Sequence, residues 1–456
     1  MEDSDAQSSV ESPKESKGGK DHLSSNKAIR VSWPYSVVPV SIALGPISTL
    51  VQLLILELNG TIIDVGLAFT LFSLGSIPAA IVWGFATDHF NVRKPVLIVS
   101  YLGVALLLIL FLFAGTAYEV TLLYIAFSLV SSASATPLSL LIMETQQKPC
   151  WAVAFARLSM MSSIGTTLGL LLSVVWADFF PVKFLVVPLA ILTVSSAILS
   201  SIMIEEPTLL FERRMLILNR VSFHERLKAL PLIFLKIPGT SEFKKAFRGM
   251  RNELTRELPL LYLSIFAFYV SGGIFNTSLA PALYMSNFPE SQIFLVVLIG
   301  MIVQSISFVL SGRYAETRSL IGVSLIGLVL RSICYAIIGI SVLLLAGTLL
   351  LLSALIFYPI AAGIAYALYY TASNTMIFNT IGEKSHGSSL GVYSAIVGVA
   401  STLGSFISGF TSFYLGYHIT FILAALLLAF SAVLTSMLKV SVATDRRLQG
   451  YHGCQR

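Results

Sequence analysis

The amino-acid sequence predicts an all-α polytopic membrane protein, with twelve transmembrane helices in two six-helix bundles. Three observations predict this fold class. Charged residues make up only 11% of the chain and the mean hydropathy is +0.85, whereas soluble domains carry about 25% charge. The apolar residues come in runs of roughly 20, the length at which a helix crosses the hydrocarbon core of a bilayer. These runs fall into two sets of six, separated by one long polar segment.

Each apolar run is expected to be a helix, because lipid offers no partner for an unpaired backbone group. The tenth run is long enough to need a bend, for which Pro359 supplies a cause. The first six spans are placed at about 34–56, 62–86, 95–115, 118–143, 152–176 and 181–203. The second six are placed at about 258–284, 289–311, 318–340, 345–377, 388–413 and 416–438.

The domain boundaries follow from these spans. Residues 1–30 are polar and of mixed charge, so they are expected to form a disordered cytosolic tail. The remaining expected domains are an N-terminal bundle at 31–203, a cytosolic connector at 204–257, a C-terminal bundle at 258–438 and a cytosolic tail at 439–456. The connector alternates basic and apolar patches, which is typical of a helix lying on the inner leaflet. An ordinary solvated linker is the alternative.

The basic residues predict the orientation. If both termini are cytoplasmic, nearly every Lys and Arg outside the spans lies on the cytoplasmic side, and only Lys183 lies outside. This is the bias expected of a multi-pass protein, here placed in the cell membrane. The net charge of +6 and the pI near 9.1 therefore reflect membrane orientation, and no nucleic-acid partner is expected.

Several function classes are excluded by what the sequence lacks. The three cysteines are scattered, and no CxxC pair or group of histidines suggests a metal or a cofactor. No G-x-x-x-x-G-K-[ST] motif is present to drive a primary pump. No cluster of acids and histidines lies at membrane depth, so an intramembrane enzyme is not expected.

The two halves repeat each other. A Gly and an acid close the second span and recur at the end of the eighth, and a Thr-Leu-Gly triplet in the fifth span recurs in the eleventh. The similar offsets indicate a duplication. The repeated residues are Gly84 and Asp88 with Gly312 and Glu316, and 167–169 with 402–404. Spans five and eleven also carry the closely spaced pairs Gly165/Gly169 and Gly404/Gly409, which suit close helix packing. A weak export signature is the other interpretation.

The most specific motif lies in the turn between spans two and three, where residues 84–94 read G-F-A-T-D-H-F-N-V-R-K. This loop resembles the signature G-x-x-x-D-x-x-x-x-R-[RK] of the major facilitator superfamily. Gly84, Asp88, Arg93 and Lys94 match the signature, while Val92 replaces its usual Gly. The resemblance covers about residues 34–438 and implies two bundles that rock about a central cavity.

The resemblance also implies that the motif latches the outward-facing state of the transport cycle. Gly84 is expected to let helices two and eleven approach, and Asp88 to lie at the N-terminus of helix eleven, where a carboxylate is favoured. Glu144 is placed to pair with Arg93 or with Arg157. The alternative is that these charges only fix the topology. The expected gating residues are Gly84, Asp88, Arg93, Lys94, Glu144, Arg157, Gly312 and Glu316.

Arg331 is the charged residue nearest the middle of a span. A charge at this depth costs about 2.5–3.5 kcal/mol or more, so it is a functional candidate. One interpretation is that Arg331 binds a substrate or an anion. The alternative is that its side chain reaches toward the outer surface or forms hydrogen bonds with helix carbonyls. Spans eight and ten offer no Asp, Glu or His, which argues against a proton-coupling network of the lactose-permease kind. The expected substrate-binding residues are Gln52, Tyr269, Asn276, Gln304, Arg331, Tyr358, Tyr366 and Tyr370.

The function expected from the resemblance is secondary active transport of a small organic solute by alternating access. An aromatic cavity suits a drug-like amphipathic compound or a sugar. Among the possible modes of transport, efflux coupled to protons is slightly favoured over uptake and facilitated diffusion. A facilitated-diffusion uniporter, or a sensor or scaffold that has lost transport, are the alternatives. The expected partners are the lipid bilayer, the solute and protons, and the resemblance implies a monomer.

Overall fold

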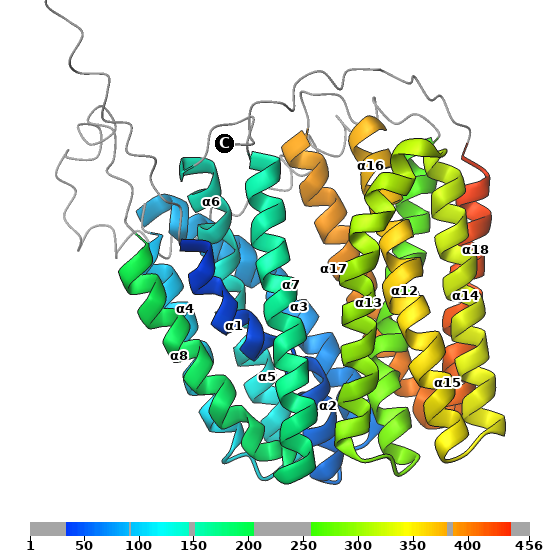
Figure 1. Cartoon of the computed structure of the whole chain (residues 1–456), viewed down its shortest axis with the longest axis horizontal. Coiled ribbons are helices and arrows are strands. Elements are labelled where there is room, and N and C mark those ends of the chain that lie inside the picture. The colour runs from blue at the N-terminus through cyan, green and yellow to red at the C-terminus, as the bar shows by residue number, and fades with distance from the viewer. Residues whose placement is uncertain (1–32, 91–92, 146–150, 205–256, 381–385, 439–456) are drawn as a thin grey trace, which may run out of the picture. The chain divides into compact units, whose positions relative to one another are not determined.

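The computed structural model describes residues 33–90, 93–145, 151–204, 257–380 and 386–438. Within this part of the chain the structure is helical and has no strand (Figure 1). Twelve of its helical segments are long and apolar enough to cross a membrane. The predicted fold class and all twelve predicted spans are therefore confirmed, and the protein is a multi-pass membrane protein. The two tails and the connector predicted from the sequence lie outside the described residues.

The described helices of the N-terminal half are η1 Trp33–Ser36, α1 Val37–Leu44, α2 Ile47–Glu57, α3 Ile62–Phe90, α4 Lys94–Phe111, α5 Ala117–Ser131, η2 Ser132–Ser134, α6 Ala135–Thr145, α7 Trp151–Phe179, η4 Val182–Leu185 and α8 Val186–Met203. Those of the C-terminal half are α12 Glu257–Met285, α13 Glu290–Thr317, α14 Leu320–Leu344, α15 Thr348–Pro359, η5 Ile360–Ala365, α16 Tyr366–Thr380, α17 His386–Leu415 and α18 Tyr417–Ser436.

Three of the described spans are interrupted, and two of the interruptions lie at or directly after a proline. Span ten passes from α15 into the π-helical segment η5 directly after Pro359, the residue at which a bend was expected. Span one breaks at Gly45 and Pro46, between α1 and α2. Pro46 has no N–H to donate to the carbonyl of Ile42, so the helix cannot continue unchanged. Span four contains the 3₁₀ turn η2 between α5 and α6.

Small residues bring helices together inside each half. A methyl group built on Gly169 of α7 would lie 2.0 Å from the carbonyl oxygen of Ile42 in α1. The matching Gly404 of α17 would meet the carbonyl oxygen of Val270 in α12 at 2.4 Å. Spans five and one thus pack as spans eleven and seven do, which is consistent with the duplication that the repeated triplet indicated. Close packing accounts for these glycines without a role in export.

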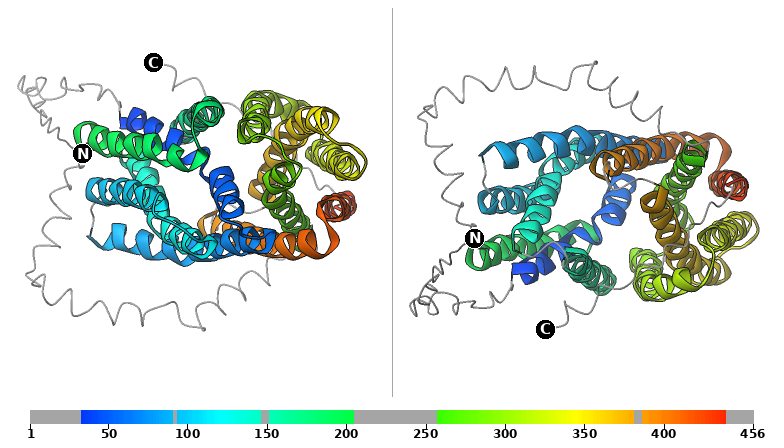
Figure 2. Two further views of the ribbon diagram at one scale, coloured as in Figure 1. Left: turned by 90° about the horizontal axis from the view of Figure 1, so that it is seen from below. Right: turned by 90° about the horizontal axis from the view of Figure 1, so that it is seen from above.

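The two halves also contact each other directly. Helix α3 runs beside α17, and α7 beside α13, as the views along the helices show (Figure 2). A methyl built on Gly66 of α3 would lie 2.7 Å from the Cα atom of Gly409 in α17. Gly84 was expected to make this close approach. Among the described atoms, however, a methyl there would meet only the hydroxyl of Thr136 in α6, at 3.6 Å. The described approach of one glycine to another between spans two and eleven is therefore that of Gly66 to Gly409.

Buried hydroxyl groups tie the helices of the C-terminal half together. Ser264 of α12 lies 2.9 Å from the hydroxyl of Ser431 and 2.7 Å from that of Thr435, both in α18. Ser278 lies 2.8 Å from the hydroxyl of Ser412 in α17. In lipid, such bonds between helices replace the hydrophobic driving force that water would supply. They hold α12 in a fixed position, and α12 carries much of the wall of the candidate site.

Candidate functional site

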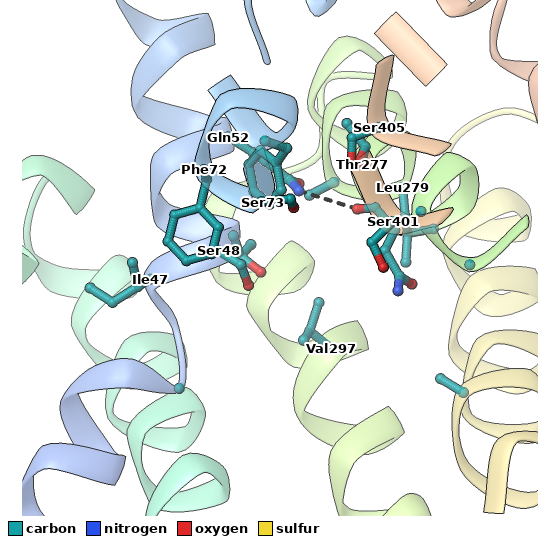
Figure 3. Close-up of a pocket in the computed structure, with 18 of the residues that line it drawn as sticks. Ile47, Ser48, Gln52, Phe72, Ser73, Thr277, Leu279, Val297, Ser401 and Ser405 are labelled. Carbon is teal, nitrogen blue, oxygen red and sulfur yellow. Dashed lines mark hydrogen bonds between the residues drawn. The ribbon is translucent and has the colours of Figure 1, made fainter. Parts of the chain in front are cut away.

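A cavity of about 820 Å³ lies between the two halves. Its wall is built from α2, α3, α5 and α7 on one side and from α12 to α17 on the other. In Figure 3, Ser48 and Phe72 from the N-terminal half share the cavity with Val297 and Ser401 from the C-terminal half. A cavity of this size lies within the range that holds a small organic molecule.

One hydrogen bond joins the halves at the cavity wall. The amide nitrogen of Gln52 on α2 donates to the backbone carbonyl of Asn276 on α12, over 3.1 Å (dashed line in Figure 3). Both residues lie on the halves of their spans that lead toward Glu57 and Met285. Gly66 and Gly409 meet toward this same end of the spans. The halves are therefore in contact on the side of the membrane opposite to that of the connector.

The N-terminal wall combines aromatic rings with hydroxyl groups. Tyr124 of α5 stacks on Phe72 of α3 at a centroid distance of 4.4 Å and lies 5.2 Å from the ring of Phe69. All three line the cavity, together with Ser73 and Ser128. This wall can hold an apolar or aromatic body and can form hydrogen bonds at its edge.

Arg331 of α14 is the central feature of the C-terminal wall. It lines the cavity and only 3% of its surface is exposed. Its guanidinium carbon lies 4.6 Å from the centre of the Phe268 ring, and 5.2 Å from those of Tyr335 and Tyr366. Cation–π contacts of this kind stabilise a desolvated guanidinium by about 2 kcal/mol in favourable cases. The buried position rules out the alternative in which Arg331 reaches the outer surface.

The hydrogen bonding of Arg331 is incomplete. Its Nε donates to the hydroxyl of Tyr335 over 2.9 Å. Its Nη1 is buried and has no hydrogen-bond partner among the described residues. Buried charged donors are almost always paired, because leaving one unpaired costs free energy. The site therefore holds a positive charge that the described part of the protein leaves uncompensated.

The three tyrosines of span ten do not share one environment. Tyr358 and Tyr366 line the cavity, and Tyr358 is buried near Phe275, at a centroid distance of 6.2 Å. Tyr370 is not part of the cavity wall, is 37% exposed, and stacks on Tyr366 at 5.6 Å. Tyr366 and Tyr370 are one turn apart on the regular helix α16, so they share a face, and of the two only Tyr366 is part of the described cavity wall.

The other expected substrate-binding residues also line the cavity, namely Gln52, Tyr269, Asn276 and Gln304. Tyr269 shares a hydrogen bond of 2.9 Å with the hydroxyl of Tyr393 on α17. Of the eight residues expected from the sequence, the structure brings all but Tyr370 together around one space. Whether they bind a solute stays a prediction.

The expected gating residues whose side chains the structure describes are not part of the cavity wall. Arg93 is buried at the start of α4 and Arg157 is exposed on α7. Lys94 is partly buried, and Gly312 has no described atom within 4 Å of a built methyl. The side chains of Asp88, Glu144 and Glu316 are outside the described part, so the pairing of Glu144 with Arg93 or Arg157 stays a prediction.

The sequence-based search missed much of the wall. Phe268, next to the expected Tyr269, makes the shortest ring contact to Arg331. The hydroxyl groups of spans one, two and four were also missed, among them Ser48, Ser73 and Ser131. Three closely spaced serines in span four, Ser131, Ser132 and Ser134, were the available signal. Ser and Thr are common in transmembrane helices, so this signal does not by itself mark a cavity.

The described lining residues include no Asp, Glu, His, Lys or Cys. Arg331 is their one charged side chain. This donor set offers aromatic faces, hydroxyls, amides and one cation. It suits the binding of a small organic molecule, and nothing in it is arranged as a nucleophile with a base.

Comparison with known proteins agrees with this architecture. The structure is similar to the crystal structure of a mutant of the nucleoside transporter NupG, with a TM-score of 0.65 and 14% identity over 89% of this chain and 98% of that one. A bacterial homologue of the human lysosomal transporter Spinster gives a TM-score of 0.66 and 14% identity, over 90% and 96%. A D-xylose–proton symporter gives 0.65 and 13%, over 91% and 97%. At such identities the likeness shows the fold.

Among curated protein sequences none matches the chain significantly. The family model of the Major Facilitator Superfamily matches residues 36–351 and 261–450. These matches extend through both halves, and the superfamily and its neighbours indicate a transporter and not an enzyme. The chain therefore belongs to the major facilitator superfamily, as its loop at residues 84–94 and its twelve spans predicted.

Proposed function

We propose that the protein is a secondary transporter that moves a small organic solute through the central cavity by alternating access. The observation that carries this proposal is the cavity itself, which both halves line and which is large enough for one small molecule. Family membership supports it, since such a cavity between two repeated halves is where transporters of this kind bind their solute. We place the protein in the cell membrane with both termini in the cytoplasm, on the distribution of Lys and Arg.

A second candidate is facilitated diffusion without a coupling ion. It is favoured by the absence of Asp, Glu and His from the described wall of the cavity, because proton coupling needs a group that titrates during the cycle. Efflux coupled to protons was the mode slightly favoured from the sequence. It would then need an acidic group outside the cavity wall, such as Glu290 at the start of α13.

Counterflow in proteoliposomes tests the proposal. Vesicles with purified protein are loaded with unlabelled solute and diluted into a trace of the labelled solute, using D-xylose, uridine and 2-naphthoate as separate probes. Transient accumulation of a labelled probe is expected, and protein-free vesicles give the background. An imposed pH gradient should leave a uniporter's rate unchanged and should drive a proton-coupled carrier. Binding of a probe without counterflow would contradict transport and favour a sensor or scaffold.

The loop at residues 84–94 is proposed to latch one state of the cycle. On this proposal, Asp88→Asn reduces the counterflow rate about tenfold or more, while expression and thermal stability stay at wild-type levels. The loss of charge removes the carboxylate that the N-terminus of α17 would favour. Glu119→Gln is the matched control, because Glu119 is an exposed acid at the start of α5. Equal rates for Asp88→Asn and the control would show that the charge serves topology alone.

A further inference from the structure

The cavity contains a fixed positive charge whose counterion is missing from the described wall. Arg331 is always protonated, since a guanidinium does not lose its proton in proteins. The wall residues supply hydroxyls, amides and rings but no carboxylate. An ion that is buried without a counterion carries a desolvation cost of several kcal/mol. A site that keeps such a charge is suited to a ligand that neutralises it.

The terminal nitrogens of the Arg331 guanidinium have no hydrogen-bond partner among the described residues. Nε is occupied by the hydroxyl of Tyr335, while Nη1 is buried without a partner. The neighbour of Nη2 is a glycine, and a methyl built on Gly272 of α12 would lie 3.7 Å from it. Two terminal N–H donors side by side match the two oxygens of a carboxylate. The rings of Phe268 and Tyr366 at 4.6 and 5.2 Å hold the guanidinium in place.

The remaining lining of the cavity indicates the chemistry of the uncharged part of the ligand. Phe69, Phe72 and Tyr124 form an aromatic cluster in the opposite half, and all three line the same 820 Å³. The wall holds one cation, so it balances one negative charge. From these observations we infer that the transported solute is an organic monoanion, with a carboxylate bound by Arg331 and an apolar or aromatic body against the N-terminal half. This inference rests on the proposed function, of which it narrows the substrate class.

Matched pairs of probes test the charge directly. Binding of 2-naphthoate and of 2-naphthamide to the full chain in lipid nanodiscs is measured by titration calorimetry, and so is binding of 4-hydroxyphenylacetate and its amide. Each acid and its amide share shape and apolar area and differ in charge. The carboxylates are expected to bind about tenfold or more tightly than the amides, since hydrogen bonds between charged partners are about twice as strong as neutral ones.

Substitutions at Arg331 and Gly272 test whether the preference for the carboxylate over the amide arises at Arg331. Arg331→Gln should abolish the difference between acid and amide, and Arg331→Lys should keep part of it, because the ammonium retains the charge but lacks the planar pair of donors. Gly272→Ala leaves the charge in place and adds a methyl beside Nη2, so it should weaken carboxylate binding alone. Arg318→Gln is the control, because Arg318 is exposed in the turn before α14. It should keep the wild-type preference.

The outcomes separate this inference from transport. Equal affinity for acid and amide in the wild type, or a preference for the acid that survives in Arg331→Gln, would overturn the inference, as would the failure of both carboxylates to bind. Counterflow of D-xylose or uridine in that case would leave transport standing. Carboxylates that bind through Arg331 but show no counterflow would support the anion site and contradict transport. Carboxylates that bind and also exchange across the membrane would support both.

Discussion

Gly169→Ala is expected to destabilise the N-terminal half strongly. The added methyl would lie 2.0 Å from the carbonyl oxygen of Ile42 and 3.2 Å from its Cα atom. Both are backbone atoms, so no side chain can turn aside, and α1 would have to move away from α7. Overpacking typically costs about 1–3 kcal/mol and more when backbone must shift, so a loss of about 3 kcal/mol or more is expected.

The measurement is the melting temperature of the purified protein, together with the fraction that elutes as a single species. A loss of this size corresponds to a decrease of roughly 6 °C or more. Gly312→Ala is the matched control, because it makes the same change in another long helix where a built methyl meets no described atom. It should be neutral or stabilising, since Ala is favoured over Gly in helices by about 1 kcal/mol. Equal melting temperatures for both variants would refute the close packing of α1 on α7.

Gly66→Val is expected to reduce counterflow about a hundredfold while leaving the protein folded. Gly66 and Gly409 belong to different halves, and a methyl on Gly66 would lie 2.7 Å from the Cα atom of Gly409. The larger side chain would keep α3 and α17 apart at this end. The cavity could then not be closed on that side, so the alternation that transport requires would be interrupted. Each half keeps its own contacts, so the melting temperature should change little.

Labelling distinguishes a blocked cycle from a damaged protein. A cysteine introduced by Thr277→Cys lies in the cavity wall, and a membrane-impermeant maleimide added from the side opposite the connector should label it faster in the Gly66→Val background. Gly115→Val is the control, because a methyl there meets nothing closer than the Glu119 carboxylate at 3.9 Å. Wild-type counterflow and unchanged labelling in Gly66→Val would show that the contact between these glycines is not part of the cycle.

Much of the fold could be predicted because the bilayer imposes a simple rule on the sequence. Each apolar run had to be a helix, and Pro359 marked the disturbance in span ten. The repeat of the triplet ending at Gly169 and Gly404 predicted that both would hold equivalent places. Arg331 could be singled out because a charge at depth is rare.

The contacts between the halves could not be predicted from the same rules. Gly66 and Gly84 lie on one helix and look alike in the sequence, but Gly66 meets span eleven while the described neighbour of Gly84 is Thr136 in span four. The choice depends on the angle at which the helices cross, and no local pattern encodes that angle. Tyr370 lies one regular turn beyond Tyr366 on α16 and stacks on it, but only Tyr366 is part of the described cavity wall. The spacing of residues on a helix shows which face they share and does not show where along that face a cavity ends.

The break in the first span has a mechanical consequence. Helix α1 packs on α7 and α8 of its own half, whereas α2, only 11 residues long, also contacts α12 of the other half. The joint between them, at Gly45 and Pro46, lacks the backbone hydrogen bond that a proline cannot form. The first span is therefore two helical segments joined at a residue pair where helices commonly bend. We expect that a change of angle at this joint lets α2 cover a bound solute while α1 keeps its place in the bundle.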